Sequence, residues 1–289
     1  MIKLKAPAKI NLCLDILSTL DNGYHSVWMV MQTIGLYDTI CVEKTDTQTI
    51  EIDCDKPNIP VDKRNIAWKA ADAFFEKTGI KNQGIRITIQ KNIPSSAGLA
   101  GGSTDGAAVL VGLNKLFDSA LTEHELCEIG QKIGADVPFC VVGGTALAQD
   151  IGQILSRLPD FEGYKIVLVK PDRDVSTKQA YNTFESKSDI RHIDSAKILH
   201  LCANGDYENS FRYFENVFEQ LVEVPERVEI KSVMRQFNAS LTLMSGSGPS
   251  VYGIFKNEND ANECAKILKK SYRDVFVCNC VKNGCEFVE

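Results

Sequence analysis

The sequence has no C-x-x-C pair, although it contains ten cysteines. The densest group is Cys278, Cys280 and Cys285, which lacks the second pair or the nearby histidines that a zinc site needs. We therefore interpret the cysteines as free thiols of a reducing compartment and expect no metal held by protein ligands alone.

Long apolar runs are also absent. No stretch approaches the ~20 apolar residues that span a bilayer. Asn11 and Asp15 interrupt the apolar run behind the N-terminal lysines, where a signal peptide would stay apolar. We expect a cytoplasmic protein with no membrane partner.

An excess of basic residues is missing as well. The formal net charge is −6, whereas general nucleic-acid binders are usually basic, so we expect no nucleic-acid partner. An anionic small molecule is compatible with this charge, because a local cluster of N–H groups and lysines can bind one. The sequence leaves the oligomeric state open between monomer and homodimer.

The length of 289 residues predicts two domains, which we place at 1–155 and 156–289. The first half alternates strands and helices in an α+β pattern: strands near 2–4, 10–16, 27–36, 40–42, 50–52 and 85–89, and helices over 65–78, 106–117 and 122–134. The second half has strands at 165–169, 241–244, 251–255 and 275–281, and helical stretches over 176–237 and 259–271. Its order, β-α-β-β-α-β, is typical of a ferredoxin-like domain.

The most informative stretch is the small-residue loop Pro94-Ser-Ser-Ala-Gly-Leu-Ala-Gly-Gly-Ser-Thr104, between a predicted strand and a predicted helix. Small residues let backbone N–H groups approach a phosphate, and the helix N-terminus adds positive potential. The loop lacks the Gly-Lys-Ser/Thr ending of a Walker loop, and no window supplies Gly-x-Gly-x-x-Gly. A flexible linker is the alternative, but the flanking strand and helix favour phosphate binding.

Phosphoryl transfer would need a metal ligand, a cation and a group that orients the acceptor hydroxyl. Ser103 and Thr104 offer hydroxyls for Mg²⁺, or they cap the helix. Lys9 lies among strand-like apolar residues, where a lysine needs a partner. Asp136, in Gly134-Ala-Asp-Val-Pro138, is a candidate partner that could direct the proton, although a turn or cap role explains it equally well.

Tyr24 and His25 follow the turn at 21–23, outside any clear core stripe. A flat ligand such as a nucleobase could stack on Tyr24 and bond to His25, although such a pair is more often structural.

Three ordered motifs resemble the GHMP kinase superfamily: Pro7-Ala-Lys-Ile-Asn-Leu12, Pro94 to Thr104, and Met244-Ser-Gly-Ser-Gly-Pro249. The resemblance spans the chain and implies an N-terminal domain of the ribosomal-protein S5 type with a ferredoxin-like second domain. Asn22-Gly-Tyr-His25 and the segment around Asp136 resemble the branch whose acceptor carries a cytidine diphosphate. That branch implies ATP-dependent phosphorylation of the 2-hydroxyl of a methylerythritol unit, in non-mevalonate isoprenoid synthesis.

The resemblance also implies roles for individual residues. Lys9 and Asp136 would be catalytic, and Ser103 would meet Mg²⁺ bound with ATP. Asn11, Tyr24, His25, Thr177 and Tyr181 would line the substrate side. The ATP site would consist of Asn65 near the adenine and of the loop residues Pro94, Ser95, Ser96, Ala97, Gly98, Leu99, Ala100, Gly101, Gly102, Ser103 and Thr104.

The chain departs from the superfamily pattern at Ala100, where glycine is common, at Thr104, where serine is common, and at Asn22, where aspartate is usual. Ala100 would loosen nucleotide binding if its φ angle has to be positive. Two other functions stay open: a related kinase with a homoserine- or mevalonate-type acceptor, and a catalytically silent nucleotide or sugar sensor.

Overall fold

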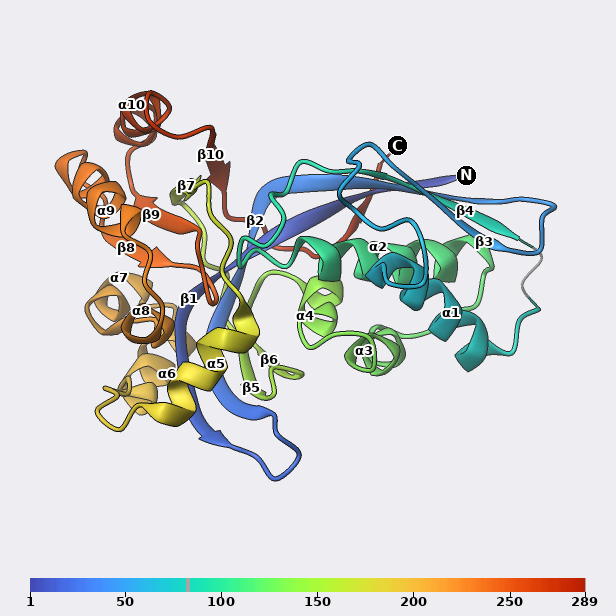
Figure 1. The fold of residues 1–289 in the computed structure, drawn as a ribbon, viewed down its shortest axis with the longest axis horizontal. Helices are drawn as coiled ribbons and strands as arrows, with labels where there is room; N and C mark the ends of the chain where they lie inside the picture. Colours follow the sequence, from blue (N-terminus) through green and yellow to red (C-terminus); the bar gives the residue numbers. More distant parts are fainter. Residues whose placement is uncertain (82–83, 289) are drawn as a thin grey trace.

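Two long antiparallel strands connect the halves of the molecule. The computed structural model describes residues 1–81 and 84–288. Strands β1 (Ile2–Thr19) and β2 (His25–Lys44) pair along most of their length, and Figure 1 shows them running from one half into the other. The prediction of two shorter strands in place of each was wrong. A register shift between Pro7 and Ala8 bends β1 without ending its pairing, so an interrupted apolar pattern concealed one strand.

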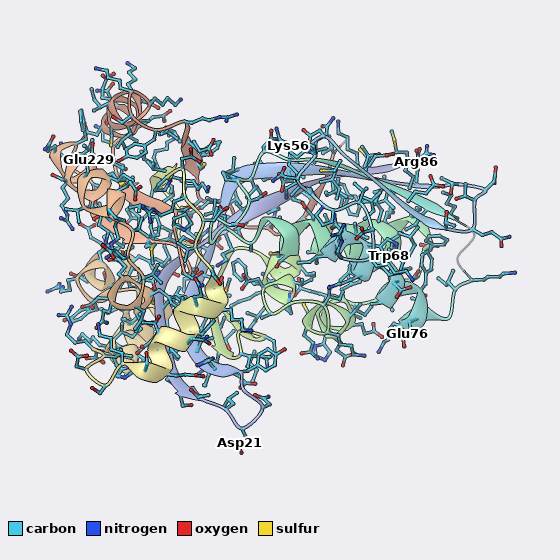
Figure 2. All side chains as sticks on the ribbon, in the orientation of Figure 1. Asp21, Lys56, Trp68, Glu76, Arg86 and Glu229 are labelled. Carbon is cyan, nitrogen blue, oxygen red and sulfur yellow. The ribbon has the colours of Figure 1, made fainter. Side chains whose placement is uncertain are left out.

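The turn between these strands lies at the end of the hairpin, where Figure 2 labels Asp21. The backbone N–H of Gly23 bonds to the carbonyl of Leu20, and Gly23 has a φ angle of +79°. The turn predicted at 21–23 is therefore confirmed.

The first sheet is built on β1 and β2. Within the described residues it has seven strands, ordered β11-β1-β2-β4-β3, with β5 pairing β2 and β6 pairing β5. The added strands are β3 (Ile50–Cys54), β4 (Ile85–Gln90), β5 (Thr145–Asp150), β6 (Ile154–Arg157) and β11 (Glu286–Phe287). Helices α1 (Ile66–Thr78), α2 (Gly101–Leu116), α3 (Glu123–Gln131) and α4 (Val137–Val142) lie together on one side of it (Figure 1).

Side-chain caps place two of these helices where the sequence predicted them. The Asn65 Oδ1 accepts from the Ala67 N–H at 2.9 Å, and Gly79 ends α1 with a left-handed residue. Thr122 and Glu125 form the expected capping box at the start of α3. This helix ends at Gln131, three residues before the predicted end.

The second sheet has four strands among the described residues, in the order β10-β7-β9-β8. They are β7 (Lys165–Lys170), β8 (Leu241–Met244), β9 (Val251–Phe255) and β10 (Asp274–Asn279). Numbered within this half, the order is 4-1-3-2, and every neighbouring pair is antiparallel. The predicted ferredoxin-like domain is confirmed, with α9 (Glu226–Gln236) and α10 (Glu258–Leu268) packed against its strands.

The long connection after β7 is helical, as predicted. It contains α5 (Thr177–Ser186), α6 (Ser195–Ala203), α7 (Tyr207–Ser210), η1 (Phe211–Tyr213) and α8 (Phe218–Leu221). Ile10 and Leu12 of β1 share one buried cluster with Leu168 of β7 and Tyr252 of β9. The two halves therefore meet across a continuous apolar core, which holds the elements that carry the site at a defined separation.

The division at 155/156 stays a prediction. It falls inside β6, which pairs with β5 of the first sheet, and residues 286–287 also return to that sheet beside β1. No helix in residues 1–81 and 84–288 is long and apolar enough to cross a membrane. All ten cysteines lie in the described part of the chain and are free thiols.

Candidate active site

A cavity of about 910 Å³ lies where β1, the loop before α2, α5 and the 245–249 turn meet. The structure brings most of the predicted site residues to its wall: Lys9, Asn11, Tyr24, His25, Asn65, Asp136, Thr177, Tyr181 and residues 94–103. Thr104 is not among the lining residues. It is fully buried, and its hydroxyl lies 4.0 Å from the Cys285 sulfur.

The loop of residues 94–104, which we call the phosphate loop after its predicted ligand, packs directly against the 245–249 turn. The Ser245 hydroxyl donates to the Gly98 carbonyl at 2.9 Å. Gly98 has a φ angle of +72°, and a Cβ there would lie 2.2 Å from the Ser245 carbonyl oxygen. Glycine is thus required at this position both by the left-handed backbone and by the close approach of the two loops.

Ala100, and not Ser103 or Thr104, is the N-cap of α2, so the suggested capping role of the two hydroxyls is wrong. Ala100 has a φ angle of +59°, a left-handed conformation that disfavours a side chain bearing a Cβ. It makes no side-chain capping bond, and the first turn of α2 contains no acidic residue. The helix start therefore presents its N–H groups and positive potential beside the cavity.

Lys9 is held at the boundary of the two halves. Its side chain is 6% exposed, and its Nζ donates to the Asn11 Oδ1 at 2.8 Å. The same Asn11 oxygen accepts the backbone N–H of Gly246 at 3.0 Å. Asn11 therefore fixes the lysine and connects the first of the three motifs to the third, a role that the sequence did not suggest.

Asp136 lies opposite Lys9, with 3.7 Å between its Oδ2 and the Lys9 Nζ. It is the N-cap residue of α4 by position, but within the described residues its carboxylate makes no capping bond. The carboxylate is 30% exposed, so it faces the cavity with Lys9 as its cationic neighbour. Such a pair can orient a hydroxyl, receive its proton and stabilise the charge on oxygen.

Aromatic side chains form the other end of the cavity. The rings of His25 and Tyr181 stack with centroids 4.4 Å apart, and the His25 Nε2 lies 3.2 Å from the Glu185 carboxylate. Tyr24 also lines the cavity and is 60% exposed. Burial, together with the nearby charge of Asp136, raises the pKa of Tyr181 to about 12, so this phenol stays neutral at physiological pH.

Two further predicted residues have structural bonds of their own. The Thr177 hydroxyl lies 2.9 Å from the Ser247 hydroxyl, which joins the start of α5 to the 245–249 turn. The Asn65 amide donates to the Pro60 carbonyl at 2.7 Å while its oxygen caps α1. Asn65 therefore shapes the cavity wall through backbone contacts.

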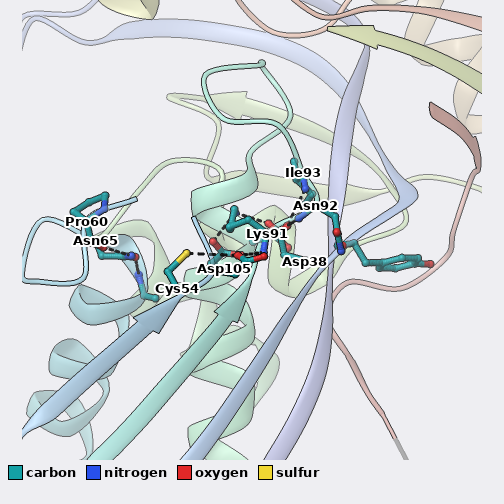
Figure 3. Close-up of polar contacts among 12 residues, drawn as sticks. Asp38, Cys54, Pro60, Asn65, Lys91, Asn92, Ile93 and Asp105 are labelled. Carbon is teal, nitrogen blue, oxygen red and sulfur yellow. Dashed lines mark hydrogen bonds and ion pairs between the residues drawn. The ribbon is translucent and has the colours of Figure 1, made fainter. Parts of the chain in front are cut away.

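Sequence reasoning missed three charged residues beneath the phosphate loop: Asp38, Lys91 and Asp105 (Figure 3). The Lys91 ammonium bonds to both carboxylates, and all three residues are buried. A signal was available in Asp105, because it is the lone carboxylate in a helix of small and apolar residues.

Comparison with known proteins identifies the family to which this chain belongs. The pattern of the GHMP kinases N terminal domain matches residues 65–144, and that of the GHMP kinases C terminal domain matches residues 193–274. This chain belongs to the GHMP kinase family.

Individual members of the family are similar to this chain over nearly its whole length. The chain is 43% identical over 282 residues to a 4-diphosphocytidyl-2-C-methyl-D-erythritol kinase of Caldicellulosiruptor saccharolyticus, covering 97% of each chain. It is 42% identical over 279 residues to the protein of the same name from Clostridium tetani, covering 96% of this chain and 99% of that one.

Solved structures agree with the fold. A crystal structure of 4-(cytidine 5'-diphospho)-2C-methyl-D-erythritol kinase superposes with a TM-score of 0.78 at 28% identity, covering 96% of this chain and 99% of the other. The homoserine kinase of Cytophaga hutchinsonii also superposes with a TM-score of 0.78, at 19% identity, over 99% of this chain and 97% of its own. At that identity the second likeness shows the fold alone.

Proposed function

We propose that this protein transfers the γ-phosphoryl group of ATP to the 2-hydroxyl of 4-diphosphocytidyl-2-C-methyl-D-erythritol, giving the 2-phosphate and ADP in the methylerythritol phosphate route to isoprenoids. The observation that carries the proposal is the placement of Lys9 and Asp136, 3.7 Å apart, on the wall of the cavity that the phosphate loop also lines. Relatives that are 40–43% identical over nearly the whole chain carry the name of this kinase.

Asp136 orients the acceptor hydroxyl and receives its proton as the O–P bond forms. The Lys9 ammonium, 3.7 Å from the carboxylate, stabilises the negative charge that develops on the attacking oxygen. Asn11 holds the Lys9 ammonium in place through the 2.8 Å bond to its Oδ1. Because this machinery does little covalent chemistry, positioning and electrostatics carry the reaction.

The ATP phosphates lie along residues 94–103, where the backbone N–H groups at the start of α2 bind their oxygens. Asn65 lies at the adenine side of the same cavity. The cytidine end of the acceptor lies near Tyr24, His25 and Tyr181, with Thr177 beside it. In this pose the two substrates meet at Lys9 and Asp136.

Mg²⁺ is the metal that this chemistry requires. A donor that fits it is present, because the Ser103 hydroxyl lines the cavity and hard oxygen ligands suit this ion. The ion would be held jointly by this hydroxyl and by the oxygens of ATP. When bound, Mg²⁺ neutralises charge on the transferring phosphate.

An ADP-release assay tests the proposal. The purified protein is given ATP, Mg²⁺ and one acceptor at a time: the cytidine substrate, homoserine or mevalonate. We expect kcat/KM for the cytidine substrate to exceed the other two by about 100-fold or more, since buried polar contacts discriminate strongly between acceptors. Turnover that favours homoserine or mevalonate would identify a related kinase, and ATP binding without ADP release on any acceptor would identify a sensor; either result overturns the proposal.

A further inference from the structure

Three buried charged residues meet at the base of the phosphate loop (Figure 3). We call Asp38, Lys91 and Asp105 the buried triad. The Lys91 Nζ donates to the Asp105 Oδ2 at 2.7 Å and also to the Asp38 Oδ2. The side chains are 0%, 6% and 4% exposed for Asp38, Lys91 and Asp105. Burying three ionisable groups costs free energy unless they are bonded to one another, so these three side chains stay buried only as a bonded set.

The triad closes the loop on itself. Lys91 follows β4 and precedes the loop, whereas Asp105 lies in α2 just after it, so their bond joins the two ends of the 92–104 segment. Asp38 of β2 fixes the start of this segment, because its Oδ1 accepts the backbone N–H groups of Asn92 at 2.6 Å and Ile93 at 2.8 Å. A segment fixed at both ends has far fewer conformations than a free loop of the same length.

The triad also lies next to the surface that ATP would contact. Lys91 and Asp105 both line the cavity. A Cβ placed on Gly101, the first residue of α2, would lie 3.3 Å from the Lys91 Nζ. The ammonium therefore packs against the first turn of α2, which supplies the N–H groups proposed to bind phosphate. Its position fixes where the backbone of that turn can lie.

The charges in the triad are arranged to suit an anionic ligand nearby. Burial and the neighbouring Asp38 raise the pKa of Asp105 well above its usual range, although Lys91 opposes the shift. The Asp105 Oδ1 is buried and has no hydrogen-bond partner within the described residues, so nothing there offsets the burial of a charge on this oxygen. The raised pKa favours the neutral form of Asp105, which lowers the negative charge beneath the proposed site of the ATP phosphates.

We infer that the buried triad holds the phosphate loop in its ATP-binding conformation, which makes Lys91 and Asp105 positioning residues for the nucleotide. The inference rests on the proposed function in taking ATP as the ligand of the loop. The triad contributes no group to the transferred phosphate. It acts through residues 92–104, so its loss weakens ATP binding and leaves acceptor binding unchanged.

Two variants of Asp105 separate positioning from general stability. Asp105→Ala removes the bond that closes the loop and leaves the Lys91–Asp38 pair intact. Asp105→Asn keeps an oxygen that accepts from Lys91 and adds N–H groups where the proton would lie. We expect Asp105→Ala to raise the Kd of ATP and its KM by about 10-fold, as misplaced binding groups do. Asp105→Asn should change them by less than about 3-fold. In both variants the KM of the cytidine substrate should stay within about 2-fold of that of the unaltered protein.

The matched control is Lys231→Met, which removes a half-buried lysine bonded to the Glu219 carboxylate; neither residue lines the cavity. It should lower the melting temperature and leave the Kd of ATP unchanged. Should Asp105→Ala not yield folded protein, Asp105→Val, which fills the same space, takes its place. The inference is overturned if the apolar variant binds ATP as well as the unaltered protein does, if asparagine rescues nothing, or if Lys231→Met weakens ATP binding equally.

Calorimetric titration with ATP alone measures the Kd without any acceptor. If the unaltered protein binds ATP but phosphorylates no acceptor, the proposed function fails, while the comparison of Kd values between the variants still decides the role of the triad.

Discussion

The two ends of the cavity are built by different means. The end that we propose for the nucleotide consists of one continuous segment, residues 94–103, fixed by buried polar groups. The end that we propose for the acceptor consists of side chains from β2 and α5, among them His25 and Tyr181, together with the exposed Tyr24. Backbone N–H groups bind any phosphate chain, whereas stacked and charged side chains select one acceptor. The difference teaches that one end can be shared by a family while the other sets its substrate.

Lys9 and Asp136 lie between the two ends, and changing them should have the largest effect. We expect Lys9→Ala and Asp136→Asn each to lower kcat by roughly 10²–10⁴-fold, the range for loss of proton transfer and charge stabilisation. Both KM values should change little. Steady-state kinetics with circular dichroism to verify folding measures this, and Asp21→Asn at the exposed hairpin turn serves as the matched control. Near-normal turnover of Asp136→Asn would leave this carboxylate no role in the proton transfer.

Tyr181→Leu should affect the acceptor end alone. Removing the ring stacked on His25 deletes a contact worth about 1 kcal/mol beyond its area, and burial is lost as well. We expect the KM of the cytidine substrate to rise by about 10-fold. Tyr272→Leu, which removes a tyrosine bonded to Glu229 outside the cavity, should change neither KM. An equal rise in the KM of ATP for Tyr181→Leu would show that the two ends are not independent.

The pH dependence of stability probes the nucleotide end. Folding raises the pKa of Asp105, so above about pH 4 the folded state keeps a proton that the unfolded state releases. The free energy of unfolding then falls with rising pH, by up to about 1.4 kcal/mol per unit. Lys91 contributes no pH dependence to the free energy of unfolding below pH ~9, because its pKa is raised from 10.5 and it is protonated in both states there. Asp105→Asn removes this pH-dependent contribution, so the free energy of unfolding of the variant relative to the unaltered protein should increase as the pH rises above ~4, measured by urea unfolding. A constant difference would mean that Asp105 is ionised in the folded protein.

Ala100→Gly should give the smallest effect. The φ angle of +59° strains alanine by about 1–2 kcal/mol, and glycine gives back about 0.4–1 kcal/mol of that through the entropy of the unfolded chain. We expect a gain of about 0.5–1 kcal/mol in the free energy of unfolding. In contrast, Ala73→Gly inside α1 should lose about 1 kcal/mol. Equal losses from both substitutions would show that the backbone at Ala100 is not strained.

The loop at residues 94–104 and the elements beside it were accessible to sequence reasoning because their information is contiguous. Strand, small-residue loop and helix follow one another in the sequence. The starts of α1 and α3 are set by Asn65 and Thr122, whose side chains bond to residues two or three positions further on. The fold class followed from the same local periodicities, and the ferredoxin-like order of the second sheet is confirmed.

What the sequence did not reveal depends on contacts between distant segments. The bond from the Asn11 oxygen to Gly246 and the stack of His25 on Tyr181 join elements whose relative placement no local pattern encodes. The buried triad draws one residue each from β2, from the end of β4 and from α2. A single charged residue in an apolar stretch suggests that a partner exists, but it does not say which one.

The pairing of β11 with β1 has a consequence for synthesis on the ribosome. Residues 286–287 complete a sheet whose first strand begins at Ile2, and Cys285 touches the backbone carbonyls of Thr104 and Cys140. The nascent N-terminal half therefore emerges with the β1 edge of its sheet open, and Thr104 and Cys140 gain their contact with Cys285 only after that residue has left the ribosome.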